Sequence, residues 1–223
     1  KELPLCNKSI HVYQYGNGNK KALLIHGWNG RGTQMSVLAK ELVDNEYTVY
    51  SFDAPGHGKS PNSRAIMTDF IEGALELDKS FGPFDLVVGH SLGGMSTVNA
   101  LSRGLHANKA VLIGAGDIIQ DIIDDFVLQL GLKKEIGKTV TRLFEKKYSK
   151  QTDVYDVYLN ASKLNLPILV IHDIDDKDVP YTCAKHIAKH LPNGVLMTTE
   201  KLGHRKILGD ENVIKKIINF STT

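Results

Sequence analysis

Apolar runs that look like strands alternate with helix-like runs along most of this chain. Two of these runs, Ala22–Ile25 and Ile168–Ile171, are apolar at every position, and unbroken apolarity is typical of parallel strands covered on both faces. The alternation predicts an α/β fold with a mainly parallel central sheet flanked by helices, which binds ligands at the carboxyl ends of its strands. Strands are expected at residues 10–15, 22–25, 48–52, 84–88, 110–113, 168–171 and 194–199.

Helix-like segments have apolar residues three and four positions apart. The rhythm breaks between Asp117 and Leu164, where helical segments follow one another without a convincing strand. We expect one domain over residues 1–223, with residues 117–164 inserted as a small helical cap or lid. An apolar stripe from Ile118 to Leu130 faces the core of this insertion or a substrate cleft, and core packing is the simpler interpretation. The helices outside the insertion are expected at residues 33–45, 66–81, 92–104, 182–190 and 212–220.

Ser91 lies in the sequence Gly-His-Ser-Leu-Gly, between a strand-like run that ends at Val88 and a helix-like run. A sharp turn from strand to helix can hold a serine nucleophile in a strained conformation, and a glycine two residues to each side avoids crowding there. The competing interpretation is a glycine-rich loop that only lets a helix pack closely on a strand. The partners available to Ser91 decide between the two.

A serine nucleophile needs a base, and histidine has a suitable pKa. His204 is the best of nine candidates, because it follows Leu202 and Gly203 after the last strand-like run and so lies in a loop at the carboxyl end of a strand. The other histidines are expected to be structural or cleft-lining (His26, His57, His90 and His172) or ordinary surface and helix residues (His11, His106, His186 and His190).

The base in turn needs a carboxylate that fixes its tautomer and stabilises the imidazolium. Candidates cluster at Asp173, Asp175, Asp176 and Asp178, directly after a strand-like run. A calcium loop is excluded because Asp178 stands where its sixth-position glycine belongs and Ala184 where its twelfth-position glutamate belongs. Asp178 is better explained as a charge at the start of a helix. The remaining aspartates stay open as the orienting acid.

Acyl transfer also needs hydrogen-bond donors for the developing oxyanion. The backbone N–H of Leu92, directly after the serine, is one expected donor. The second is the N–H of Trp28, in the loop that starts at His26, where glycines at 27 and 30 make the backbone compliant.

Composition excludes several other classes of protein. The formal charge is only +2, and the basic residues between Lys133 and Lys147 are interrupted by glutamates and apolar residues, so no nucleic-acid partner is expected. Gly58-Lys59-Ser60 ends like a phosphate-binding loop, but Asp53 occupies the position of its first glycine. No cofactor and no metal are predicted, and the expected partner is a small-molecule acyl substrate.

Cellular location is expected to be the cytoplasm. No apolar stretch reaches the roughly 18 residues that stable membrane insertion requires, and no secretory apolar region is visible. Cys6 and Cys183 lie far apart and are expected to be free thiols in a reducing compartment. The sequence starts at Lys1, so a removed signal peptide stays an alternative. The oligomeric state is open.

Four motifs, taken in chain order, resemble the α/β-hydrolase family across nearly the whole sequence. They are His26-Gly27, Asp53 to Gly58, the serine turn at Gly89 to Gly93, and Asp176 to Pro180 followed by Gly203-His204. The resemblance implies a triad of Ser91, Asp176 and His204, with Trp28 and Leu92 binding the oxyanion. Departures from the family are Asp173 in place of a usual glycine and a length that suggests missing first edge strands. Asp117 stands where a variation known in the family has the acid.

The resemblance implies hydrolysis of carboxylic esters of small to medium acyl groups through an acyl-enzyme. The same machinery serves thioesterases, lactonases, peptidases and carbon-carbon bond hydrolases, and fold and triad do not select among them. An alternative of another class is a non-catalytic, ligand-binding protein on the same scaffold.

Overall fold

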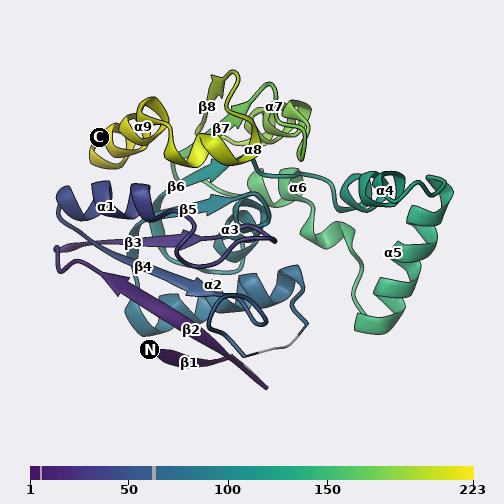
Figure 1. The fold of residues 1–223 in the computed structure, drawn as a ribbon, viewed down its shortest axis with the longest axis horizontal. Helices are drawn as coiled ribbons and strands as arrows, with labels where there is room; N and C mark the ends of the chain where they lie inside the picture. The colour runs from purple at the N-terminus through teal and green to yellow at the C-terminus, as the bar shows by residue number, and fades with distance from the viewer. Residues whose placement is uncertain (6, 62–63) are drawn as a thin grey trace.

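A computed structural model describes residues 1–5, 7–61 and 64–223, and its centre is one eight-stranded sheet (Figure 1). The strand order is β1-β2-β4-β3-β5-β6-β7-β8. The first two strands pair antiparallel, as do β2 and β4, and all other neighbours are parallel. The predicted α/β class is therefore confirmed. The strands are β1 (Glu2–Leu5), β2 (Lys8–Tyr15), β3 (Lys20–Ile25), β4 (Tyr47–Asp53), β5 (Phe84–His90), β6 (Ala107–Ile113), β7 (Ile168–Asp173) and β8 (Gly194–Thr199).

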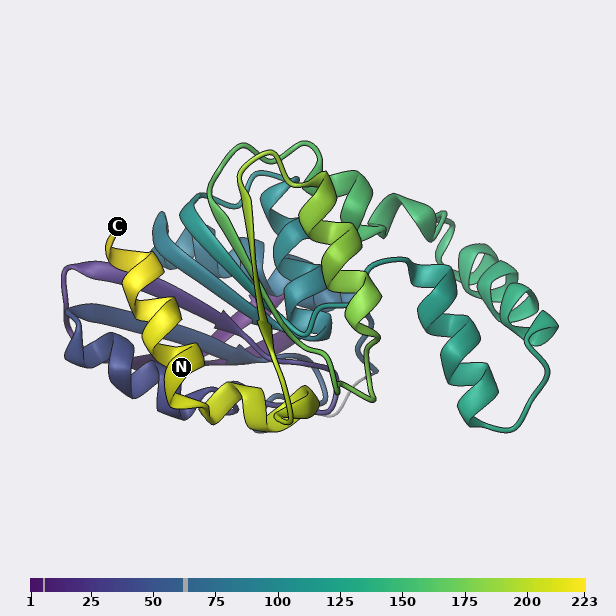
Figure 2. The ribbon, with the colours of Figure 1, turned by 90° about the horizontal axis from the view of Figure 1, so that it is seen from above.

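Helices cover both faces of the sheet (Figures 1 and 2). One apolar core contains residues of α2, α3, α6 and α7, and the other contains residues of α1 and α9. Every residue of β7 and the run Ala22–Ile25 of β3 are buried, which is what continuous apolarity predicts for strands covered on both sides. The helices are α1 (Ser36–Asp44), α2 (Met67–Phe81), α3 (Leu92–Leu101), α4 (Ile119–Gln129), α5 (Glu135–Tyr148), α6 (Val157–Ala161), α7 (Tyr181–His190), α8 (Gly203–Lys206) and α9 (Glu211–Thr222), with short 3-10 turns η1 (Asp153–Tyr155) and η2 (Ile207–Gly209).

The expected lack of first edge strands is wrong. Glu2 to Leu5 pair with Lys8 to His11 as an antiparallel hairpin at one edge of the sheet. The pattern of β1 is hard to detect because the strand is only four residues long, contains Pro4 and buries a single residue, Leu5. A proline is tolerated there because an edge strand needs fewer ladder hydrogen bonds.

The parallel strands bring their carboxyl ends to one edge. Register pairs Ile25 with Gly89, His90 with Ile113, and Ile113 with Ile171. The loops that follow β3, β5, β6 and β7 therefore start side by side, which is the place where open α/β sheets bind ligands.

Helices α4 and α5 form a hairpin that projects away from the sheet (Figures 1 and 2). They touch along one line, where Thr141 Oγ1 donates to Gln120 Oε1 at 2.8 Å. Val127 is buried, but Phe126 is 58% exposed, and Ile122 and Leu130 are exposed as well. Core packing of the α4 stripe is therefore wrong for these three residues, because a helix pair with a single contact line cannot bury so broad a stripe.

Two further observations concern the membrane and the thiols. Within the described ranges, no helix combines the length and apolarity that crossing a bilayer requires. Cys183 is a partly buried free thiol, and burial, followed by the nearby Asp117 and Asp121 carboxylates, raises its pKa to about 11. Cys6 lies outside the described residues.

Candidate active site

Ser91 forms the turn between β5 and α3. Its φ of 55° and ψ of −121° lie outside the regions that non-glycine residues favour, so the turn is strained. A Cβ on Gly89 would lie 2.3 Å from the Gly93 carbonyl oxygen, and a Cβ on Gly93 would lie 2.1 Å from the Ile25 carbonyl oxygen. The steric requirement for both glycines is therefore confirmed, and it positions the serine at the carboxyl edge of the sheet.

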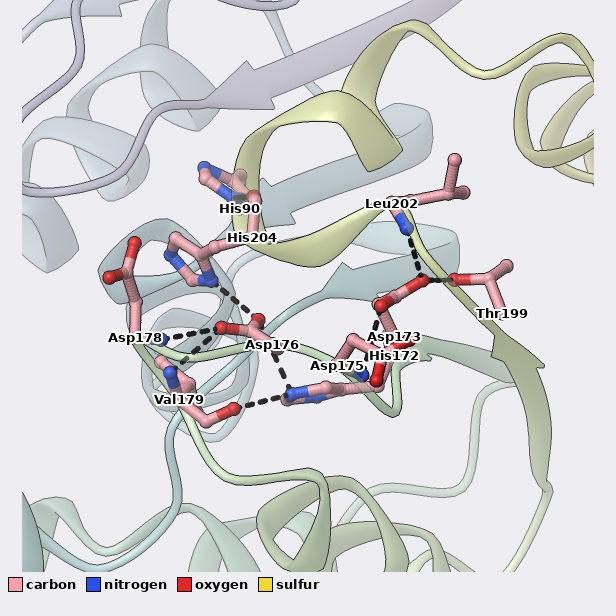
Figure 3. Close-up of polar contacts among 10 residues, drawn as sticks. All are labelled: His90, His172, Asp173, Asp175, Asp176, Asp178, Val179, Thr199, Leu202 and His204. Atoms are coloured by element: carbon pink, nitrogen blue, oxygen red, sulfur yellow. Dashed lines mark hydrogen bonds and ion pairs between the residues drawn. The ribbon is translucent and has the colours of Figure 1, made fainter.

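His204, in the short segment after β8, and Asp176, in the loop after β7, are brought together (Figure 3). His204 Nδ1 donates to Asp176 Oδ2 at 2.6 Å. The other carboxylate oxygen, Oδ1, accepts from the backbone N–H groups of Asp178 and Val179, each at 2.9 Å. Burial by itself would raise the pKa of Asp176, but the hydrogen bonds from His204 and the two backbone groups outweigh it and hold this pKa below its ordinary value. Asp176 is therefore a buried, ionised partner for the imidazole.

The expected loop setting of His204 needs a correction. The residue lies in the one-turn helix α8, directly after Gly203, whose φ is 62°. The left-handed backbone at Gly203 turns the chain sharply after β8. Helix α8 has only four residues, which is too short for a helical pattern of apolar residues to be visible in the sequence. Its place at the carboxyl end of β8 is as predicted.

No hydrogen bond joins Ser91 to His204 in the described part of the chain, and the serine turn contacts His204 through His90. The ring of His90, the residue before the serine, lies 4.7 Å from the His204 ring between centroids, and His90 Nε2 donates to the His204 carbonyl oxygen at 2.9 Å. A loose serine–histidine geometry is common in enzymes without substrate, where the hydrogen bond tightens on binding.

Asp173, which replaces a glycine usual in the resembled family, links the loops that carry the acid and the base. Its carboxylate accepts from Thr199 Oγ1 at 2.7 Å, from Leu202 N at 3.1 Å and from Asp175 N at 3.0 Å (Figure 3). Burial favours the neutral form, but these hydrogen bonds prevail and lower the pKa of Asp173. The departure from the family pattern thus gives the site a second buried carboxylate.

Asp117, the alternative acid, points elsewhere. Its Oδ2 accepts a hydrogen bond from His186 Nδ1 on α7, and its Oδ1 accepts from Tyr158 N at 2.8 Å. The side chain therefore joins the start of the α4 segment to α7. His186, expected to be an ordinary helix residue, is thus a specific hydrogen-bond partner of Asp117. Asp117 and His204 share no hydrogen-bond partner among the described residues.

The loop after β3 runs beside the serine. A Cβ on Gly27 would lie 3.1 Å from Ser91 Cβ, so the next residue, Trp28, is adjacent to the nucleophile turn. The Gly27 carbonyl oxygen accepts from His26 Nδ1 at 2.7 Å and from Gly30 N at 2.9 Å, and the Trp28 carbonyl accepts from His57 Nε2 at 2.7 Å. Both carbonyl oxygens thus have hydrogen-bond donors, while Trp28 as a residue is 48% exposed.

Asp53 is a site residue whose contacts the sequence does not reveal, although it opens one of the four family-like motifs and is a mismatch to a phosphate-binding loop. It is fully buried and accepts from Gly32 N at 2.6 Å, Lys59 N at 2.7 Å and Tyr13 Oη at 2.7 Å. Burial and the Asp53 carboxylate raise the pKa of Tyr13 to about 12. Asp53 therefore ties the loop after β4 to the Trp28 loop, and its position at the end of a strand does not by itself reveal these partners.

A cavity of about 650 Å³ adjoins this loop. Its lining includes Trp28, His57, Arg64, Ile66 and Tyr148, the last from the end of α5. Ser91 is outside the lining, so the cavity is a neighbour of the nucleophile turn and not its immediate surroundings. In the residues that the structure describes, no cluster of three histidine, cysteine or acidic side chains is arranged to hold a metal ion.

Stability should fall as the pH drops from about 6.5 toward 4. Burial lowers the pKa of His26 and of His90 from 6.5 to about 4. In this window the unfolded chain binds protons that the folded chain does not, so acid favours unfolding, by an upper limit of roughly 3 kcal/mol per histidine. Urea unfolding at pH 7 and pH 4.5 measures the effect, and His90→Gln should lower the slope. A free energy of unfolding that is flat across the window would contradict the buried neutral state of these rings.

Comparison with known proteins agrees with this architecture. The sequence matches the Alpha/beta hydrolase family over residues 22–209, and the chain belongs to that family. Among curated proteins it is 30% identical, over 60% of its own length and 38% of the relative's, to the dihydrolipoyllysine-residue acetyltransferase component of the acetoin cleaving system of Cupriavidus necator. It is 29% identical to Esterase YbfF of Escherichia coli over 41% of its own length and 37% of the relative's. Both matches thus cover little more than a third of the relative.

Solved structures share the fold. An esterase from Exiguobacterium antarcticum superposes with a TM-score of 0.76 at 16% identity, over 97% of this chain and 96% of the esterase. A putative lipase from Acinetobacter baumannii gives a TM-score of 0.75 at 20% identity, over 99% of this chain and 89% of the lipase. At such identities the likeness establishes the arrangement of the chain, and activity has to be argued from the site.

Proposed function

We propose that the protein is a serine hydrolase that cleaves carboxylic esters of small to medium acyl groups through an acyl-enzyme. The observation that carries the proposal is the 2.6 Å hydrogen bond between His204 Nδ1 and the buried Asp176 carboxylate, next to a strained serine turn. This bond fixes the tautomer that leaves His204 Nε2 unprotonated, which is the state a general base requires. The family membership and the esterase among its relatives agree with this reaction class.

In the proposed mechanism Ser91 Oγ attacks the ester carbonyl while His204 Nε2 takes its proton. Asp176 stabilises the imidazolium, and the N–H groups of Leu92 and Trp28 donate to the oxyanion. The tetrahedral intermediate then collapses, His204 protonates the leaving alcohol, and Ser91 carries the acyl group. Water, deprotonated by His204, attacks the acyl-enzyme in the same way and releases the acid and the free serine.

We further propose that residues 117–164 act as a cap over the substrate. A Cβ on Gly116 would lie 2.9 Å from Ile122 Cδ1 and 3.1 Å from Met95 Sδ, so the α4 stripe starts beside the helix that follows the nucleophile. Exposed Phe126 continues this stripe. An apolar wall that starts beside α3 suits an acyl chain.

Hydrolysis of p-nitrophenyl esters with acyl chains of increasing length tests the proposed substrate class. We expect turnover of acetate and butyrate esters, with kcat/KM falling for chains of about 12 carbons or more, because so small a cap shelters a limited length of chain. A preference for the long chains would contradict the small to medium class. Absence of turnover on every ester, with a folded protein, would contradict the esterase assignment.

A further inference from the structure

Three buried histidines lie at the carboxyl edge of the sheet without belonging to the proposed triad. His26 directly follows β3, His90 ends β5, and His172 is the penultimate residue of β7. All three side chains are almost completely inaccessible to solvent. Burying an imidazole has a desolvation cost that an apolar side chain would avoid. Because three imidazoles are buried at the same edge of the sheet, we look for one role that all three share.

Each ring donates one hydrogen bond to a backbone carbonyl of a different loop. His26 Nδ1 donates to Gly27 O at 2.7 Å, His90 Nε2 to His204 O at 2.9 Å, and His172 Nε2 to Val179 O at 3.0 Å. A carbonyl oxygen can only accept, so the ring nitrogen facing it must carry the hydrogen. These three loops are the ones that hold the proposed oxyanion donor, the base and the acid.

The His26 bond sets the direction of the Trp28 N–H. Gly27 O and Trp28 N–H belong to one peptide unit, and in a trans peptide they point in opposite directions. Holding the carbonyl against His26 therefore aims the N–H away from His26. The tautomer is fixed from the other side, because His26 Nε2 accepts from Ala54 N at 3.1 Å.

The other two bonds act on the base and on the acid. His90 holds the backbone of His204 itself, so the serine turn and the base are joined by one hydrogen bond. His172 closes the loop in which Val179 N donates to Asp176 Oδ1, and its Nε2 also lies 3.5 Å from Asp176 Oδ2 (Figure 3). Both rings keep Nδ1 buried and without a partner among the described residues, which leaves the Nε2 bond as their visible polar function.

We propose that His26, His90 and His172 are positioning residues, each of which orients one catalytic loop through a single N–H to carbonyl hydrogen bond. The proposal rests on the proposed function, since the loops matter because they carry Trp28, His204 and Asp176. Burial keeps the rings uncharged near neutral pH, with lowered pKa values for all three, so each presents one defined donor.

Paired substitutions at each position test the proposal. Leucine removes the hydrogen-bond donor and keeps the bulk of the side chain. An amide side chain restores the donor, because the nitrogen of Asn reaches the place of Nδ1 and the nitrogen of Gln reaches the place of Nε2. We expect His26→Leu, His90→Leu and His172→Leu to lower kcat on an ester by about 10-fold to 100-fold with KM within twofold, because displacing a catalytic group by about 1 Å has effects of that size. His26→Asn, His90→Gln and His172→Gln should recover kcat to at least one third of wild type. His106→Leu is the control, since His106 precedes β6 at the opposite edge.

Two results would overturn the positioning role: a folded leucine variant with wild-type kcat, or an amide variant no better than its leucine counterpart. If a leucine variant does not fold, the folded amide variant at the same position tests the positioning role. A kcat of at least one third of wild type supports that role, and a lower kcat contradicts it. Labelling of wild-type Ser91 by a fluorophosphonate separates this outcome from the proposed function. An unlabelled wild type contradicts the function itself, whereas a labelled wild type with unaffected leucine variants contradicts only the positioning.

Discussion

Replacing Ser91 by alanine should abolish ester hydrolysis, lowering kcat by about 10⁶-fold. The hydroxyl is the only group at the turn that the mechanism uses to form the acyl-enzyme, and it sits on a strained backbone with φ 55°, next to His90, whose ring contacts the His204 ring. Without it no acyl-enzyme forms, and the reaction is accelerated only by substrate binding and by hydrogen bonds from the oxyanion donors. Initial rates on p-nitrophenyl butyrate, measured at high enzyme concentration, give the ratio.

The substitution should leave the fold intact. Alanine has the smaller side chain, Ser91 is not fully buried, and no hydrogen bond from its hydroxyl joins it to the described residues. The thermal midpoint should therefore stay within a few degrees of wild type. Retained turnover in a sample free of contaminating esterase would contradict the assignment of the nucleophile.

Replacing Asp176 by asparagine should lower kcat by about 10⁴-fold. The amide keeps the shape of the side chain but removes the charge that stabilises the imidazolium. It can also present an N–H toward His204 Nδ1, which selects the wrong tautomer. The loss should appear in kcat with little change in KM, because the Asp176 side chain is almost inaccessible to solvent and bonds to His204 Nδ1, so the substrate does not reach it.

Asp117→Asn is the matched comparison, since it makes the same chemical change at the alternative acid. Asp117 bonds to His186 and to the backbone of Tyr158, so we expect kcat within about threefold of wild type and a lower thermal midpoint. A large loss of kcat in the Asp117 variant with a small one in the Asp176 variant would reverse the assignment of the acid.

The sequence predicts well which residues lie at the carboxyl ends of the parallel strands, because several local patterns point to the same place. Continuous apolar strands, paired glycines around Ser91 and a run of aspartates after β7 each point to the carboxyl ends of parallel strands, and the structure places them there. The choice of Asp176 over Asp117 came from family resemblance. The structure adds what sequence spacing cannot supply, namely that Asp117 has His186 as a partner from a helix 69 residues away in the chain.

Other features are out of reach because they depend on tertiary contacts. The exposure of Phe126 follows from the single contact line between α4 and α5, and a helical stripe by itself does not reveal how many neighbours it has. The roles of Asp53 and Asp173 likewise depend on backbone N–H groups contributed by other loops. Buried carboxylates of this kind look in sequence like ordinary polar residues at strand ends.

The most direct test of the account is the site of covalent modification by a fluorophosphonate, mapped by peptide mass spectrometry on the folded protein. We predict one adduct per chain, on Ser91, formed rapidly by wild type and much more slowly by the His204→Ala variant, because His204 activates the hydroxyl. A protein that hydrolyses esters but carries the adduct on another residue, or none at all, would contradict the assignment of Ser91 as the nucleophile.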